Sequence, residues 1–224
     1  KTGDNLLKLL IATGQDIRVL IIKLADRLHN LRTLGALPPE KQKKIARESL
    51  EVFAPLADRL QMGRVRVEIE ETSFRYVDPK RFEYLKNLTA ERLAEADKKL
   101  KHARQTVEHA LKKEGISYRC DGRVKSIYSL HKKLAKYNQN IDRIYDIIAL
   151  RFIVADTTTC YLVLGIIHSL FTPMDGRVKD YIAMPKQNGY QSLHTTVITP
   201  DKQVVEFQIR TEEMHRTAEY GIAA

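Results

Sequence analysis

The sequence has only two cysteines, no internal repeat and no long apolar run. A helix that crosses a membrane needs about 18 or more consecutive apolar residues, so we expect no transmembrane segment, and nothing resembles a signal peptide. Cys120 and Cys160 lack the spacing of a metal site, which predicts reduced thiols in a cytosolic protein. These absences argue against a membrane protein and against a disulfide-stabilised secreted domain.

The composition is that of a soluble globular protein, with 43% hydrophobic and 29% charged residues among 224. This length allows one large domain or two small ones. The formal net charge is +10, and most of the excess lies in residues 1–114. Such a charge suits nucleic acid, ribosomes or polyphosphate substrates, but solvated helix faces give the same excess. The chain starts at Lys1 and enters a helical pattern almost at once, which suggests a fragment of a longer protein.

The first half of the chain has the apolar periodicity of helices. Helices are expected over residues 17–34, 40–62, 65–76 and 82–113. Pro55 predicts a kink or a break in the second helix near Phe53-Ala54, and Gly63 is expected to end this helix. The last of these helices is highly charged, so we expect a solvent-exposed connector between two modules.

The second half has the pattern of a sheet with helices. Strands are expected over residues 117–120, 145–155, 178–184 and 204–210, with helices over 123–133, 157–170 and 211–220. Asp121-Gly122 and the segment 185–189 have turn-forming residues. The sequence therefore predicts a helical part followed by a sheet domain.

Two carboxylates lie on the predicted strands. Asp146 interrupts an apolar strand, where it either pairs with an arginine or binds Mg²⁺. Glu206, Gln208 and Arg210 share one face of the last strand because side chains alternate along a strand. Asp146 and Arg151 are an odd number of residues apart, so the strand between them must twist, bulge or end if both serve one ligand.

Cations and an aromatic ring gather in two other segments. Lys125, Ser129 and Lys133 recur every four residues after Arg123, which predicts either a polyphosphate cradle or a plain basic helix face. The segment 177–194 is either a solvated basic turn or a surface for phosphate and a base. Its candidate ligands are Lys179, Lys186, Asn188, Tyr190 and His194. With two carboxylates, these are the parts of Mg²⁺-assisted phosphoryl or pyrophosphoryl transfer.

Several of these segments resemble the RelA/SpoT family, the long (p)ppGpp synthetases and hydrolases of the bacterial stringent response. The matching segments are Gly122–Ser129, Tyr145–Arg151, Asn188–His194 and Val205–Thr211. In the first half, Lys23–Asn30 and Phe53–Leu60 resemble the end of the family's HD-type hydrolase domain. The resemblance implies an α+β fold, with a partial HD-type domain and linker helices before a nucleotidyltransferase-like mixed sheet flanked by helices. It divides the chain into residues 1–76, a connector helix 77–115 and a synthetase domain 116–224.

The resemblance also implies a reaction, in which pyrophosphate moves from ATP to the 3′-hydroxyl of GDP or GTP with Mg²⁺. Asp146 would bind the metal, and Glu206, supported by Gln208, would assist it or act as general base. The residues implied for ATP are Arg123 and Arg151 at the adenine and Lys125, Ser129 and Lys133 at the phosphates. Those implied for GDP or GTP are Tyr190 as the stacking ring and Lys179, Lys186, Asn188 and His194.

The hydrolase part departs from the family pattern. Its Mn²⁺ site needs HD and HDxxED motifs, which this sequence does not contain. Asp26, implied as a metal ligand, shares a helix face with Asn30, and Thr33 follows one turn on; the last two are implied nucleotide contacts, although surface or capping roles fit the same pattern. We expect no ppGpp hydrolysis by this chain, with Mn²⁺ relevant only if the other ligands were present.

Two other interpretations stay open from the sequence. One is a catalytically silent guanine-nucleotide-binding module, and the other is an RNA- or ribosome-binding module, which only the net charge supports. Family members meet ribosomes through domains that this chain lacks, so we expect no direct nucleic-acid binding and no membrane contact. A bifunctional synthetase/hydrolase of which this is a fragment is also compatible with the sequence.

Overall fold

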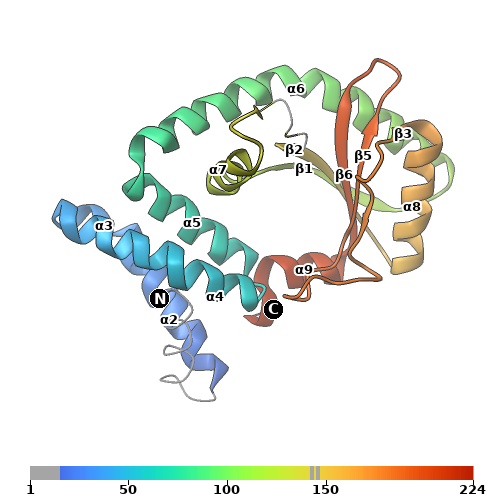
Figure 1. The fold of residues 1–224 in the computed structure, drawn as a ribbon. Coiled ribbons are helices and arrows are strands. Elements are labelled where there is room, and N and C mark those ends of the chain that lie inside the picture. Colours follow the sequence, from blue (N-terminus) through green and yellow to red (C-terminus); the bar gives the residue numbers. More distant parts are fainter. Residues whose placement is uncertain (1–15, 142–143, 145–146, 224) are drawn as a thin grey trace. The chain divides into compact units, whose positions relative to one another are not determined.

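The computed structural model describes residues 16–141, 144 and 147–223, without the side chains of residues 95–99. The chain forms two compact units, one of Lys1–Tyr84 with Thr217–Ala224 and one of Leu85–Arg216 (Figure 1). The first unit is helical, and the second contains the sheet.

The helical unit begins with α2 (Ile17–Arg32), where the helix was expected, and the Asp16 side chain caps it by accepting a hydrogen bond from the backbone N–H of Arg18 at 2.9 Å. The elements that follow are η1 (Leu34–Ala36), α3 (Pro39–Glu48), η2 (Ser49–Phe53), α4 (Ala54–Arg59) and α5 (Gly63–Val77). Their apolar faces enclose one core that includes Leu24, Leu31 and Ile69. The helical spacing of the leucines in the sequence therefore predicted this packing correctly.

Pro55 disturbs the second predicted helix as expected. Instead of a simple kink, the segment Ser49–Phe53 is π-helical before the chain returns to the α-helix of α4. Proline has no N–H for the carbonyl of Glu51, four residues before it, and its ring crowds that carbonyl. An inserted wide turn relieves both problems without ending the helix.

Gly63 does not end a helix, contrary to the prediction. The chain turns earlier, at Gln61, which has a φ of 57°, and α5 begins at Gly63. A Cβ atom at position 63 would lie 2.2 Å from the carbonyl oxygen of Ala218, which belongs to the same unit. Gly63 is needed for this close approach of two backbones rather than for a helix stop.

We expect Gly63→Ala to lower the free energy of unfolding by about 1–3 kcal/mol, because the added methyl group collides with backbone that cannot rotate away. Gly165 in α8 (Thr157–Leu170) offers a matched control, since a Cβ there meets no atom within 4 Å. Gly165→Ala should raise stability by roughly 0.5–1 kcal/mol through the better helix propensity of alanine. Urea unfolding of both variants checks the contrast, and equal midpoints would contradict it.

The long helix α6 (Pro79–Lys113) is continuous, as predicted, but it is not a solvent-exposed connector over its whole length. Ala103, Val107 and Leu111 are buried and pack on the sheet. Residues four apart share a helix face, so these three form a stripe that the surrounding charged residues obscure in the sequence.

Within the part of the chain that the structure describes, the sheet is mixed and has six strands in the order β1-β2-β6-β5-β3, with β4 paired to β5. Its strands are β1 (Tyr118–Val124), β2 (Ile148–Val154), β3 (Thr172–Pro173), β4 (Lys179–Asp180), β5 (Leu193–Ile198) and β6 (Val204–Thr211). β2 and β6 are parallel and the other pairs are antiparallel. The helices α7 (Ile127–Lys136), α8 and α9 (Glu212–Tyr220) complete the chain (Figure 1). The predicted fold class, a helical part followed by a mixed sheet with flanking helices, is confirmed.

One face of the sheet is apolar and carries the core of its unit. Phe152 and Phe207 lie on this face, and Val163 and Ile167 of α8 pack against it together with α6. Alternation along each strand places the intervening residues on the opposite face. The opposite face is therefore available for polar groups.

Two local predictions in this unit were wrong, and a strand was missed. Asp121-Gly122 is not a turn, because β1 runs straight through both residues, which pair with β2. The strand expected over 178–184 is reduced to β4, since the Asp180 carboxylate accepts hydrogen bonds from the backbone N–H groups of Ile182 and Ala183 and starts a turn there. β5 was not predicted at all.

The structure shows the state of the two cysteines and the character of the helices. Both cysteines are free, and burial raises the pKa of Cys120 to about 11 and that of Cys160 to about 12, so both stay protonated at neutral pH. Within the described residues, no helix has the length and apolar character needed to cross a membrane.

Candidate functional site

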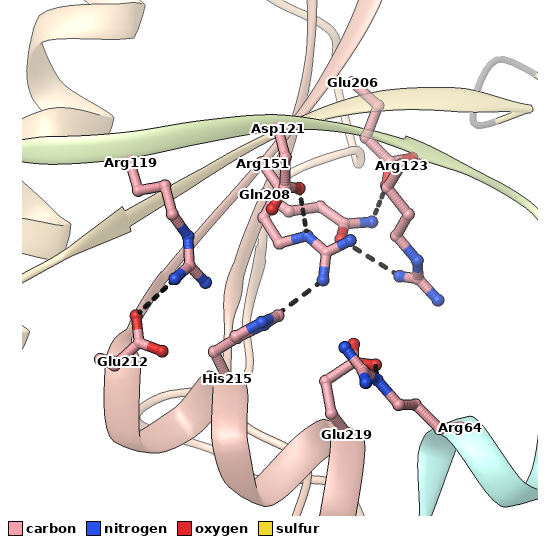
Figure 2. Close-up of polar contacts among 10 residues, drawn as sticks. All are labelled: Arg64, Arg119, Asp121, Arg123, Arg151, Glu206, Gln208, Glu212, His215 and Glu219. Carbon is pink, nitrogen blue, oxygen red and sulfur yellow. Dashed lines mark hydrogen bonds and ion pairs between the residues drawn. The ribbon is translucent and has the colours of Figure 1, made fainter.

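The polar face of the sheet is built by four strands. Residues paired across neighbouring strands point to the same face, so the pairs Asp121–Arg151, Arg151–Gln208 and Gln208–His194 extend one face from β1 to β5. Most of the residues predicted for a site on these strands lie here, as Figure 2 shows for its central part. The residues on this face are Arg119, Asp121, Arg123, Arg151, His194, Glu206, Gln208 and Arg210.

Gln208 lies at the centre of this face and is only 4% exposed. Its Oε1 accepts a hydrogen bond from Nη1 of Arg123 at 3.1 Å, and its Nε2 donates to Oε1 of Glu206 at 2.9 Å. A guanidinium can only donate and a carboxylate can only accept, so the two partners fix the orientation of the amide. One amide thereby links a cation implied for the donor nucleotide to the carboxylate implied for catalysis.

His194 continues the chain of contacts toward the acceptor side. Its Nδ1 lies 3.8 Å from Oε1 of Glu206, and its Nε2 is 2.8 Å from the hydroxyl of Tyr190. Burial, assisted by nearby cations, lowers the pKa of His194 to about 3, so the ring is neutral at pH 7. A neutral ring beside a carboxylate keeps its proton on Nδ1, and Nε2 then accepts from Tyr190. His194 therefore meets its neighbours as a neutral hydrogen-bonding group rather than as a cation.

Tyr190 is held by its neighbours in the turn that precedes β5. Its backbone N–H donates to Oδ1 of Asn188 at 3.1 Å, and Gly189 between them has a φ of 80°. Nζ of Lys186 lies 4.7 Å from the centroid of the Tyr190 ring and 4.7 Å from that of Tyr181. The predicted turn is thus present, and it brings a cation and an aromatic ring together.

The predicted phosphate cradle is only partly a helix face. α7 begins at Ile127, and Ser126 caps it by accepting from the backbone N–H of Ser129 at 3.3 Å. Lys125 therefore precedes the helix and does not share a helix face with Ser129 and Lys133, as the spacing of four had suggested. Ser126 also donates through its hydroxyl to the hydroxyl of Ser129 at 2.7 Å, and the sequence reasoning gave Ser126 no role.

Lys179 and Arg151 come from different parts of the sheet. Lys179 in β4 pairs with His194 across β4–β5 and is exposed. Arg151 in β2 is 8% exposed, and its guanidinium lies beside Asp121 and His215. The roles implied for both residues stay predictions.

The sequence reasoning missed three residues of this face or its border. Asp121 was interpreted as part of a turn, and His215 gave no signal in the sequence. Arg210 was placed on the correct face by alternation but received no role, although it is 2% exposed and its guanidinium lies 6.0 Å from the centroid of Tyr190. The position of a buried cation close to an aromatic ring distinguishes Arg210, and this contact is visible only in the structure.

The predicted ligands of Mg²⁺ are Asp146 and Glu206. Asp146 lies outside the described residues, and β2 begins at Ile148. Among the described residues no group of three or more His, Cys, Asp or Glu side chains could hold a metal ion. Mg²⁺ usually takes one or two carboxylates and completes its shell with water and phosphate oxygens, and Glu206 fits such a set.

The residues implied for the hydrolase lie in the helical unit. Nδ2 of Asn30 donates to Oδ2 of Asp26 at 3.2 Å, which confirms that the two share a face of α2. The Thr33 hydroxyl donates to the carbonyl of His29 at 3.3 Å and helps to end the helix. Capping thus explains Thr33 structurally, and the metal and nucleotide roles of the three residues stay predictions.

The fold and this face together define a class of protein. It is an α+β domain in which one sheet face presents a buried carboxylate, several cations and a tyrosine, an arrangement suited to polyphosphates and a nucleobase.

Comparison with known sequences identifies the family. The pattern described as "Region found in RelA / SpoT proteins" matches residues 122–224, and that of an HD domain matches residues 2–63. The bifunctional (p)ppGpp synthase/hydrolase SpoT of Escherichia coli K12 is 47% identical over 222 residues, which are 99% of this chain and 32% of that protein. The bifunctional (p)ppGpp synthase/hydrolase RelA of Mycobacterium tuberculosis is 46% identical over 222 residues, 99% of this chain and 30% of that protein. The chain belongs to the RelA/SpoT family, and it spans about three tenths of the length of these relatives.

A solved structure is also similar. The small alarmone synthetase 2 of Bacillus subtilis is 26% identical, with a TM-score of 0.48, over 58% of this chain and 75% of that protein.

Proposed function

We propose that this chain contains a (p)ppGpp synthetase, which transfers pyrophosphate from ATP to the 3′-hydroxyl of GDP or GTP. The observation that carries the proposal is the series of hydrogen bonds from Arg123 through Gln208 to Glu206, beside which Nδ1 of His194 lies 3.8 Å from Glu206 and Nε2 of His194 is hydrogen-bonded to Tyr190. This series joins groups suited to a donor nucleotide, to proton removal and to an acceptor base on one face. The family membership supports the same reaction.

In this proposal the groups serve the donor nucleotide, the acceptor nucleotide or the transfer between them. Arg123 and Arg151 hold the adenine of ATP, and Lys125, Ser129 and Lys133 neutralise its phosphates. Tyr190 stacks on the guanine, and Lys179, Lys186 and Asn188 orient the phosphates and ribose of the acceptor. Because Gln208 donates to Oε1 of Glu206, the carboxylate is held in one orientation while it accepts the proton of the 3′-hydroxyl.

The reaction would use Mg²⁺, held by Glu206 and Asp146 together with phosphate oxygens. When bound, the metal neutralises charge on the transferring group. The bond from the 3′-oxygen to the β-phosphorus of ATP forms while the bond from that phosphorus to the α-phosphate oxygen breaks. AMP leaves and the pyrophosphate is retained on the acceptor.

Incubation with labelled ATP, GDP or GTP, and Mg²⁺ tests the proposal. We expect equal amounts of AMP and of a guanine nucleotide with two additional phosphates, separated by charge. 3′-Deoxy-GDP is the matched control, because it retains the base and phosphates but lacks the attacking hydroxyl, and it should give neither product. Release of ADP, or no product at all, would contradict the proposal.

A further inference from the structure

Arg151 has a buried guanidinium whose surroundings are unusually specific. Its Nε lies 3.0 Å from Oδ1 of Asp121, the residue opposite it on β1. Its Nη1 lies 3.4 Å from Nδ1 of His215, which comes from α9. Two groups from two different elements therefore face one guanidinium (Figure 2).

The chemistry of these contacts fixes their direction. A guanidinium stays charged and can only donate hydrogen bonds, so Nδ1 of His215 must accept and the ring proton lies on Nε2. Asp121 supplies the negative charge that a cation needs when it is only 8% exposed. Because Asp121 is at Nε and His215 is at Nη1, they restrain the plane of the guanidinium at two separate points.

The plane matters because of the second arginine on this face. Arg123 lies two residues beyond Asp121 on β1, so both point to the same face, and its own guanidinium is held by Gln208. Two flat cations, each fixed by its own acceptors, suit the faces of a planar base better than two mobile cations do. Lysine in either place would lack this planarity.

We propose that Asp121 and His215 are positioning residues that orient the Arg151 guanidinium for the base of the donor nucleotide. This inference rests on the proposed function, which assigns Arg151 to ATP. It gives a task to two residues that have no role in the proposed function.

The chain offers a matched control on the same two elements. Nη1 of Arg119 in β1 lies 3.4 Å from Oε2 of Glu212 in α9, and the two side chains are 54% and 55% exposed. Such a pair contributes little to stability. Glu212→Gln therefore removes a carboxylate that joins β1 to α9 through Arg119, and it leaves Asp121 and His215 beside the Arg151 guanidinium.

The first experiment measures binding, so that it does not depend on turnover. Titration of a non-hydrolysable ATP analogue should show affinity about tenfold weaker for Asp121→Ala than for the unmodified chain, because the Arg151 guanidinium loses the carboxylate that pairs with its Nε. Affinity for GDP should stay unchanged. Asp121→Asn retains an acceptor oxygen and should recover most of the lost affinity, and Glu212→Gln should bind both nucleotides normally.

His215 gives an independent pair of variants in case Asp121→Ala unfolds, which thermal unfolding would show. His215→Ala removes the acceptor, whereas His215→Asn can place its Oδ1 near the former Nδ1. We expect the KM for ATP to rise several-fold in His215→Ala and to recover in His215→Asn, with the KM for GDP unchanged. A purely structural role of His215 would instead change the KM values for ATP and for GDP together.

The outcomes separate the two proposals. If the unmodified chain binds the ATP analogue and makes product but the Asp121 and His215 variants bind it normally, the positioning role is wrong and the proposed function stands. Equal losses for ATP and GDP would also overturn the positioning role. If the unmodified chain binds no ATP analogue, both proposals fail.

Discussion

Glu206→Gln is expected to reduce the rate of pyrophosphate transfer by about 10²–10⁴-fold, the range over which a positioned general base contributes. The substitution leaves the shape of the side chain almost unchanged and retains an oxygen that can accept from Gln208. It removes the charge that would bind Mg²⁺ and the basic group that would accept the proton of the 3′-hydroxyl. The loss should therefore appear in kcat.

Single-turnover measurements with saturating ATP and GDP check this result. Thermal unfolding should show a folded protein, since Glu206 is buried and the neutral amide has a smaller desolvation cost than the carboxylate. Glu206→Asp is a useful comparison, because it retains the charge but withdraws it by one methylene group. By resemblance, Asp146→Asn should cause a comparable loss. Undiminished product formation by Glu206→Gln would remove Glu206 from the reaction.

Tyr190→Ala should raise the KM for GDP by about 5- to 150-fold, which corresponds to the roughly 1–3 kcal/mol of a lost base–aromatic stack. The KM for ATP should change little, because Tyr190 lies on the acceptor side of Glu206, beyond His194. The ring also carries the contact with the ammonium of Lys186, at 4.7 Å from its centroid, so the variant leaves this cation only the second of its two aromatic contacts, with Tyr181. Steady-state kinetics with each nucleotide varied in turn measures the two constants.

Tyr190→Phe separates the ring from its hydroxyl. The stacking surface stays, while the hydrogen bond to Nε2 of His194 is lost. We expect the KM for GDP to stay within a few-fold of the original value. If Tyr190→Ala affected ATP and GDP equally, the assignment of the ring to guanine would be wrong.

The strands that were predicted correctly are those in which apolar and polar residues follow one regular pattern over most of the strand. Apart from Arg151, β2 is apolar because it is buried on both faces and has neighbours on both sides, and β6 alternates cleanly between core and polar face. β5 was missed because threonine occupies both of its faces. Thr195 is buried in the core side and forms a hydrogen bond with His168 of α8 at 2.8 Å, a tertiary contact that no local pattern reveals.

In the candidate site too, a regular local pattern identified residues, whereas contacts between distant segments were not visible in the sequence. Residues with a characteristic spacing, such as Glu206 and Gln208, were found because a strand places them on one face. Asp121 was misinterpreted because Asp-Gly is a common turn dipeptide, and only the pairing of β1 with β2 places its carboxylate opposite Arg151. Lys125 was assigned to a helix face because spacing alone does not show that the cap at Ser126 begins the helix one turn later.

The order of the strands has a consequence for how the protein is made. β6 is the last of the six strands in the chain, yet it lies between β2 and β5 in the sheet. A growing chain therefore synthesises both neighbours first, and each keeps an open edge until residues 204–211 emerge. Pairing between segments this far apart is slow, and open edges favour aggregation in the meantime. A chain that stops before Val204 would lack Glu206 and the strand that pairs with both β2 and β5.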